Sequence, residues 1–257
     1  MLMITSSSNP RLKRARLLLQ SGKRRRVENA LVLEGARLIE DALGAGVQPD
    51  YILYSPTATD ASQALIQRLA TTAIECLAVE AALFDDLSET QNTQGILAVC
   101  PFSELPTPTA IQFALILDHV ADPGNMGTIL RTASAVGVDV VIIAPHGVDP
   151  TNPKVVRGAM GAHFRLPIRR WGWEQIAALG LPLFMADAHG THTIYEQNWQ
   201  LPLGVVIGGE TRGFAENAHQ LSLEVVRIPM VAGESLNAAV AASVILYEVY
   251  RQCRVLG

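Results

Sequence analysis

The second half of the chain alternates short apolar runs with helical segments, and this pattern constrains the fold most. Strands are predicted at 113–117, 138–143, 183–186, 204–207 and 225–228. Several of these runs are apolar without alternation, which is typical of parallel strands buried on both faces. Helices are predicted at 126–136, 153–160, 173–179 and 237–253. The pattern predicts a doubly wound α/β domain whose ligand site lies at the carboxyl ends of the strands.

The first hundred residues alternate in the same way but more weakly. Strands are predicted at 30–33, 51–54, 74–79 and 95–100, and helices at 11–20, 36–43 and 61–70. Between the two parts, Pro101–Thr109 contains three prolines and no glycine, which indicates a linker. We therefore expect a small α/β domain at 1–100, a linker at 101–110 and a larger domain at 111–257.

The composition excludes several protein classes. Hydrophobic residues make up 49% of the 257 residues and charged residues 17%, so a packed core is expected and global disorder is not. The longest apolar run, 238–247, is too short to span a bilayer, and no signal-peptide core follows the N-terminus. The cysteines Cys76, Cys100 and Cys253 lie far apart, which fits a reducing cytoplasm without disulfides.

Positive charge is concentrated at the N-terminus. Residues 1–26 contain eight basic residues and no acidic one, which leaves 12 basic against 24 acidic residues in the rest of the chain. Such an asymmetry predicts a basic arm that binds an anionic partner, and the alternative is a solvated, frayed tail. The candidate anion-binding residues are Arg11, Lys13, Arg14, Arg16, Lys23, Arg24, Arg25 and Arg26.

Asp118–Arg131 has the order strand, Gly/Pro turn and helix. If the helix begins near Met126, Asn125 is a natural N-cap. Arg131 then projects away from the apolar stripe of that helix, where a ligand can reach it. The alternative is an ordinary capped helix with a solvated arginine.

Two further segments follow predicted strands. Ile207–Gly213 contains Gly208, Gly209 and Gly213, which permit close backbone approach to a ligand, but it matches neither common nucleotide-phosphate motif. Glu210 in this turn is either a site carboxylate or an exposed turn residue. The segment Ile228–Asn237 opens the apolar C-terminal helix, which Ser235 or Asn237 can cap.

The histidines suggest no metal site. His189 and His192 lie three residues apart in a glycine-containing turn, and no third ligand is indicated. The chain also has no Gly-x-Ser-x-Gly elbow.

The three segments, in this order, resemble the three motifs of the SpoU (TrmH) family of RNA 2′-O-methyltransferases in the SPOUT superfamily. The first resembles Asn-x-Gly-x-x-x-Arg, here Asn125, Gly127 and Arg131, and the second Gly-x-Glu-x-x-Gly, here at 208–213. The third matches Ile-Pro-Met followed by Ser-Leu-Asn, here at 228–230 and 235–237. Residues 155–162 are similar to a family segment that often has serine at position 159, which is alanine here. The stretches 33–40 and 94–98 resemble the family's L30e-like substrate-binding domain.

The resemblance implies a SPOUT domain with a parallel sheet and a deep C-terminal trefoil knot. It also implies a homodimer whose interface builds the active site, and S-adenosylmethionine as the cofactor, with no metal. The implied cofactor residues are Ile207, Gly208, Gly209, Glu210, Gly213, Ile228, Met230, Ser235, Leu236 and Asn237. The implied catalytic residues are Arg131, Asn125, Glu210, Ser235 and Asn237. The basic arm would then bind RNA, with ribosomal RNA preferred over transfer RNA.

Two roles for Arg131 stay open. The family account makes it the base for the ribose 2′-hydroxyl, but a neutral guanidine is costly at pH 7. The other role is electrostatic stabilisation of the developing alkoxide, with a phosphate or water taking the proton. Two other classes of protein are alternatives: a catalytically silent RNA-binding module and a dinucleotide-dependent oxidoreductase. The intact motif residues count against the first, and the missing GxGxxG motif counts against the second.

Overall fold

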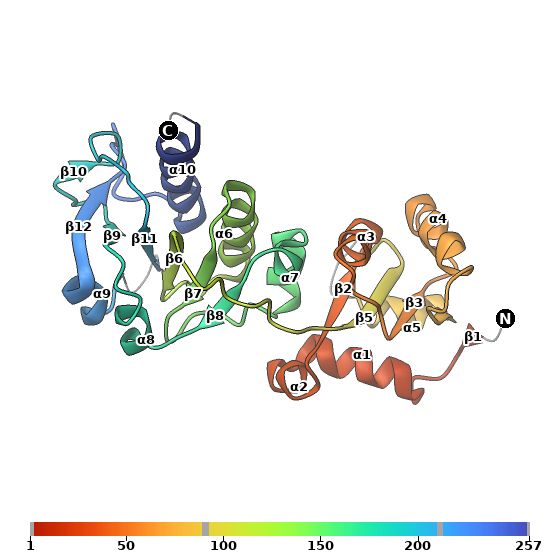
Figure 1. Cartoon of the computed structure of the whole chain (residues 1–257). Coiled ribbons are helices and arrows are strands. Elements are labelled where there is room, and N and C mark those ends of the chain that lie inside the picture. Colours follow the sequence, from red (N-terminus) through yellow and green to blue (C-terminus); the bar gives the residue numbers. More distant parts are fainter. Residues whose placement is uncertain (1–2, 89–92, 210–212, 256–257) are drawn as a thin grey trace. The chain divides into compact units, whose positions relative to one another are not determined.

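The computed structural model describes residues 3–88, 93–209 and 213–255 and shows a mixed α/β chain (Figure 1). Contacts divide the chain into two compact units. The first contains Met1–Ser103 together with Thr151–Phe164, and the second contains Glu104–Pro150 and Arg165–Gly257. Within the described residues, no helix is long and apolar enough to cross a membrane.

The first unit is built on a five-stranded sheet in the order β1-β4-β3-β5-β2. The strands are β1 (Met3–Ile4), β2 (Ala30–Glu34), β3 (Tyr51–Tyr54), β4 (Cys76–Val79) and β5 (Ile96–Pro101). β4 pairs in parallel with β1 and β3, whereas β5 is antiparallel to both β2 and β3. The last residue of β5 is Pro101, so the strand enters the segment predicted as a linker.

Helices cover both faces of this sheet (Figure 1). The helices are α1 (Pro10–Gln20), α2 (Gly22–Glu28), α3 (Ala36–Gly44), α4 (Asp60–Leu69) and α5 (Ala81–Asp85). One core cluster joins Leu12 and Leu18 of α1 to Tyr51 and Leu53, and the other joins Ile39 and Leu65 to Ile52. Tyr51 and Leu53 therefore face the opposite side of the sheet from Ile52, as strand geometry requires.

Residues 151–164 belong to this unit although they lie far along the chain. They contain α7 (Pro153–Ala159) and a 3₁₀ turn (Ala162–Phe164). Val156 is fully packed in the same cluster as Ile39, and the Arg157 guanidinium lies 3.2 Å from the Glu34 carboxylate. The sequence division of the chain had placed this segment with residues 111–257.

The second unit contains a sheet in the order β10-β12-β9-β11-β6-β7-β8, with every pair parallel. Its strands are β6 (Phe113–Asp118), β7 (Val140–Ile143), β8 (Ile168–Arg170), β9 (Leu183–Ala186), β10 (His192–Thr193), β11 (Leu203–Gly208) and β12 (Ser222–Arg227). The predicted parallel sheet is confirmed. The trefoil knot stays a prediction.

Four α-helices of the second unit are described: α6 (Pro123–Val136), α8 (Trp173–Ala177), α9 (Glu216–Leu221) and α10 (Ala238–Tyr250). Ile176 of α8 and Ala218 of α9 pack with strand residues such as Ile116 in one cluster. α10 packs against α6 and β11, and a π-helical turn follows it at Arg251–Val255. This arrangement puts the N-terminus of α10 near the carboxyl end of β11.

The start of α6 differs from the prediction. The helix begins at Pro123, and Asp122 rather than Asn125 is its N-cap, since the Asp122 Oδ1 accepts a hydrogen bond from the Asn125 backbone at 2.8 Å. Proline at the first helical position fits this start, because it has no N–H that would need a partner there. Asn125 therefore lies in the first turn, and its side chain is left for other contacts.

Candidate active site

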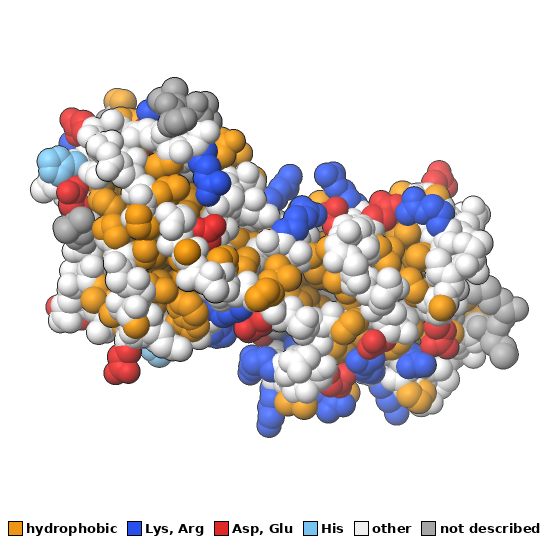
Figure 2. Space-filling model, viewed as in Figure 1, with side chains coloured by type: hydrophobic (Ala, Val, Ile, Leu, Met, Phe, Trp, Pro, Cys, Tyr) orange, Lys and Arg blue, Asp and Glu red, His pale blue; other side chains and the backbone are white. Residues whose placement is uncertain are grey.

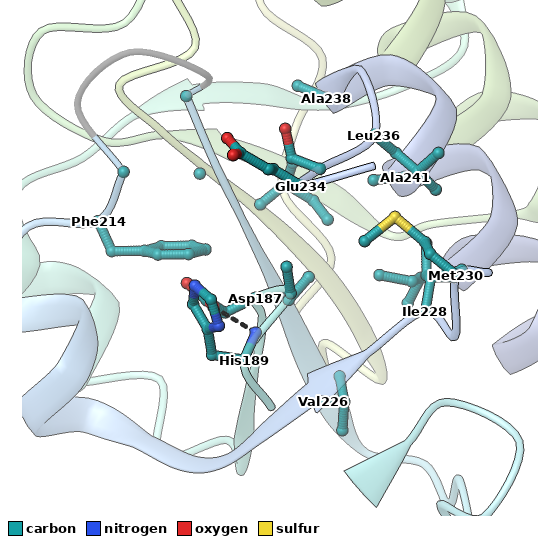
Figure 3. A pocket seen from close by; sticks show the side chains of 18 residues that line it. Asp187, His189, Phe214, Val226, Ile228, Met230, Glu234, Leu236, Ala238 and Ala241 are labelled. Atoms are coloured by element: carbon teal, nitrogen blue, oxygen red, sulfur yellow. Dashed lines mark hydrogen bonds between the residues drawn. The ribbon is translucent and has the colours of Figure 1, made fainter. Parts of the chain in front are cut away.

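A pocket of about 250 Å³ opens where β9, β11 and β12 end and α10 begins (Figure 3). The carboxyl ends of parallel strands meet at this edge of the sheet, which is where ligands bind in such folds. The pocket is lined by eight of the residues that the sequence singled out for a cofactor: Ile207, Gly208, Gly209, Gly213, Ile228, Met230, Ser235 and Leu236. Glu210 lies outside the described residues, and Asn237 is not part of the lining.

Two glycines let the backbone form the wall of the pocket. A Cβ on Gly208 would lie 2.8 Å from the Phe214 ring, and one on Gly209 would lie 2.2 Å from the carbonyl oxygen of His119. The Gly213 backbone N–H donates to the Gly209 carbonyl at 3.1 Å and closes the two ends of the turn on each other. No residue with a side chain fits at 208 or 209 without displacing these neighbours.

The first and third motifs meet through two asparagines. The Asn237 side-chain amide donates to the Asn125 Oδ1 at 3.0 Å. Asn237 also caps α10, because its Oδ1 accepts from the backbone N–H of Ala239 at 3.0 Å. Of the two capping candidates, Asn237 fills the position, and Ser235 lies on the pocket instead.

Arg131 lies on the exposed side of α6, as the helical spacing predicted, while Ile129 and Ala133 are buried. It does not line the pocket of its own chain. Within the described ranges, the structure shows no hydrogen bond or ion pair for its guanidinium. The first motif thus leaves an arginine on the surface of α6, available to another molecule.

Several further residues on the pocket were not predicted from the sequence. Asp187 and His189 follow β9, Phe214 follows the glycine turn, and Glu234 precedes the cap of α10 (Figure 3). The Asp187 Oδ1 accepts a hydrogen bond from the His189 backbone at 2.8 Å and shapes this turn. Asp187 and His189 could have been found, because they directly follow a buried strand of a parallel sheet.

Lys and Arg side chains gather over α1 and α2 (Figure 2). The arm is therefore two packed helices, not a frayed tail. Arg11 pairs with Glu75 at 3.0 Å, and Arg24 pairs with Glu28 at 2.5 Å, but both arginines are about half exposed. Surface pairs of this kind are weak and can exchange for another anion.

Two further arginines of the arm are held more firmly within the fold. Arg25 is buried, and one guanidinium nitrogen donates to the carbonyls of Leu18 and Leu19 at 2.7 and 3.1 Å. Arg25 therefore has a structural role in the fold, which charge counting does not detect. Arg14 is held by Glu28 at 2.6 Å and Asp50 at 2.7 Å. Lys13 and Lys23 are exposed and Arg16 is half-buried.

The cysteines do not offer a nucleophile. Burial raises the pKa of the Cys100 thiol to about 12, and burial also raises the pKa values of Cys76 and Cys253. All three are free thiols. In the part of the chain that the structure describes, no group of three or more His, Cys, Asp or Glu side chains can hold a metal ion.

Comparisons with known proteins match both parts of the chain. Residues 112–247 match the model of the SpoU rRNA Methylase family, and residues 9–98 match the MRM3-like substrate binding domain. An uncharacterized tRNA/rRNA methyltransferase from Synechocystis is 34% identical over 97% of this chain and 93% of its own length. The chain belongs to the SpoU methylase family.

Two further relatives of this SpoU family chain are characterised by name. The 23S rRNA (guanosine(2553)-2′-O)-methyltransferase RlmP of Bacillus subtilis is 29% identical, over 95% of this chain and 97% of its own. The crystal structure of the SpoU methyltransferase AviRb from Streptomyces viridochromogenes, in complex with AdoMet, has a TM-score of 0.81 and 28% identity. It covers 97% of this chain and all (100%) of AviRb.

Proposed function

We propose that this SpoU family chain methylates a ribose 2′-hydroxyl of ribosomal RNA with S-adenosylmethionine. The observation that carries the proposal is the convergence of Gly208, Gly209 and Gly213 with residues of the segment 228–236 on one pocket, next to the Asn125–Asn237 contact. Ribosomal RNA is favoured over transfer RNA because RlmP, which matches both domains, acts on 23S rRNA by its name. That substrate also favours a cytoplasmic location.

The pocket fits the chemistry of the cofactor. Ile228, Met230 and Leu236 offer apolar contacts to an adenosyl group, and the glycine backbone can approach it closely. Asp187 and Glu234 offer carboxylates to a cationic ligand. When bound, S-adenosylmethionine supplies an electrophilic methyl group on a sulfonium. Most of the remaining work is positioning, because methyl transfer is an in-line displacement.

In this proposal Arg131 stabilises the alkoxide that develops on the ribose. A guanidinium stays charged at neutral pH and presents several donors, so it lowers the energy of an oxyanion without giving up a proton. Asn125 and Asn237 hold the first turn of α6 against the start of α10, and so fix where Arg131 projects. The 2′-hydroxyl proton leaves to a phosphate or to water.

We also propose a homodimer in which Arg131 acts at the partner's pocket. Arg131 does not line the pocket of its own chain, and it shares the exposed side of α6 with Thr128 and Ala135. On the neighbouring α10, the apolar side chains of Val240 and Tyr247 are 49% and 54% exposed. An exposed apolar patch of this kind often marks an interface.

RNA held by the first unit would contact Lys13, Arg16 and Lys23, together with the weakly paired Arg11, Arg24 and the exposed Arg26. The MRM3-like substrate binding domain covers most of this unit and supports an RNA-binding role.

Tritium transfer from labelled S-adenosylmethionine to ribosomal RNA tests the proposal, and mapping of methylated riboses identifies the nucleotide. Transfer to ribosomal RNA is expected. Transfer only to transfer RNA would replace the substrate, and RNA binding without any transfer would indicate a silent module.

For the dimer, Arg131→Ala is mixed with a pocket variant, Gly209→Val. Recovery of activity in the mixture is expected if each active site uses both chains.

A further inference from the structure

Asp118 is a buried acid with no role in the chemistry above. It ends β6 and is completely buried, which is rare for an aspartate without a partner. Its Oδ2 accepts a hydrogen bond from the Ala215 backbone N–H at 2.6 Å. In the sheet, Asp118 lies opposite Gly208. The Asp118 side chain therefore holds the chain just after the glycine turn. Its backbone lies beside Gly208, where the turn begins.

His119 contacts the other end of the same turn. Its backbone has a φ of 56°, in the left-handed region that histidine adopts more often than most residues. In this conformation the carbonyl oxygen of His119 lies only 2.2 Å from the position that a Cβ on Gly209 would occupy. The close approach of Gly209 to the first motif thus depends on the backbone of His119.

The side chains of this pair face each other. The Asp118 Oδ1 and the His119 Nδ1 lie 3.2 Å apart, and within the described residues neither atom has a hydrogen-bond partner. The His119 ring also stacks on His146, with ring centroids 5.7 Å apart and planes 10° from parallel. The buried carboxylate is therefore opposite an imidazole that is itself fixed in place.

We propose that Asp118 and His119 are positioning residues for the cofactor, which hold the two ends of the glycine turn at the spacing that the pocket needs. This inference rests on the proposed function. The same short segment continues to Asp122, which caps α6. One turn of chain therefore sets both the cofactor loop and the start of the helix that carries Asn125 and Arg131.

Calorimetric titration with S-adenosylhomocysteine measures this role without turnover. Asp118→Ala should weaken the affinity at least about tenfold, because it removes a charge-assisted hydrogen bond from the turn. Asp118→Asn should restore it to within about threefold, since an amide oxygen can still accept from Ala215 and the amide nitrogen can donate to His119. A residue needed only for folding would change the melting temperature but not give this pattern of loss and rescue.

A second pair of variants tests the role of the His119 backbone in cofactor binding. His119→Val should weaken binding more than His119→Gly, because a β-branched residue resists a positive φ and glycine does not. His146→Ala is the control and should bind within about threefold of the wild type, because it removes the stack on the His119 ring but changes neither the His119 backbone nor Asp118. If Asp118→Ala does not fold, the His119 pair decides the question.

Wild-type affinity of a folded Asp118→Ala variant for S-adenosylhomocysteine would overturn the inference. An Asp118→Asn variant that binds as weakly as Asp118→Ala would also overturn it, and so would equal binding by the two His119 variants. Absence of binding by the wild-type chain would instead overturn the proposed function, and this inference with it.

Discussion

The Asn237 side-chain amide donates to the Asn125 side-chain oxygen at 3.0 Å and so joins two motifs that lie 112 residues apart. Since Asn237 also caps α10, one residue carries two functions that mutation can separate. The contact fixes the start of the helix bearing Arg131 relative to the segment that lines the pocket.

Asn237→Ser should separate these functions. Serine is an equally good N-cap but is too short to keep the bond to Asn125, so stability should change little while turnover falls about tenfold. Asn125→Ala should cause a similar loss. The double variant should be no worse than the poorer single one, because both remove the same interaction. Additive losses in single-turnover methyl transfer would contradict the contact's role.

Arg131→Ala should lower turnover by about 10² to 10³, the range seen when an oxyanion-stabilising donor is removed. Its affinity for S-adenosylhomocysteine should stay within about twofold of the wild type, because we assign Arg131 to the ribose 2′-hydroxyl and not to the cofactor. Arg131→Lys tests geometry, since lysine keeps the charge but loses the planar fork. Near-normal turnover of the alanine variant would eliminate the role.

The salt dependence of RNA affinity should distinguish the exposed lysines from the buried Arg25. Each of Lys13→Ala and Lys23→Ala should reduce the dependence of RNA affinity on salt by about one unit of slope, as the loss of one phosphate contact does. Arg25→Ala should lower the unfolding midpoint, because it leaves buried carbonyls without their donor, and leave the salt slope unchanged. Filter binding at several salt concentrations measures the slopes.

The Glu28 carboxylate should make the first unit sensitive to acid. A hydrogen bond from Arg14 lowers the pKa of Glu28 below its ordinary value of 4.5. A lowered folded-state pKa gives stability that is present above the unfolded pKa and is lost as the pH falls through the folded one. Glu28→Gln should therefore be less stable than the wild type at pH 7, and the difference should shrink near pH 3. Urea unfolding at the two pH values checks this.

Periodicity and strand ends predicted most of the architecture, because apolar patterning reports burial directly, whereas the resemblance to the SpoU family supplied most of the pocket lining. The exposed position of Arg131 followed from helical spacing alone. The start of α6 was missed because Asp122-Pro123 is a stronger start signal than Asn125. The burial of Arg25 depends on carbonyls that only the folded helices bring together, and no local sequence pattern predicts it. The same holds for residues 151–164, whose grouping with the first unit is a tertiary contact.

Gly209→Ala should test the pocket most directly. The added Cβ would lie 2.2 Å from the carbonyl oxygen of His119, so backbone must move, and we expect cofactor affinity to fall more than tenfold. Gly180→Ala is the matched control: its φ of 63° makes alanine unfavourable by about 1 kcal/mol, yet the space around it is open and it does not line the pocket. Reduced stability with normal affinity is expected for Gly180→Ala. If Gly209→Ala behaves in the same way, backbone contact at this turn does not shape the binding site.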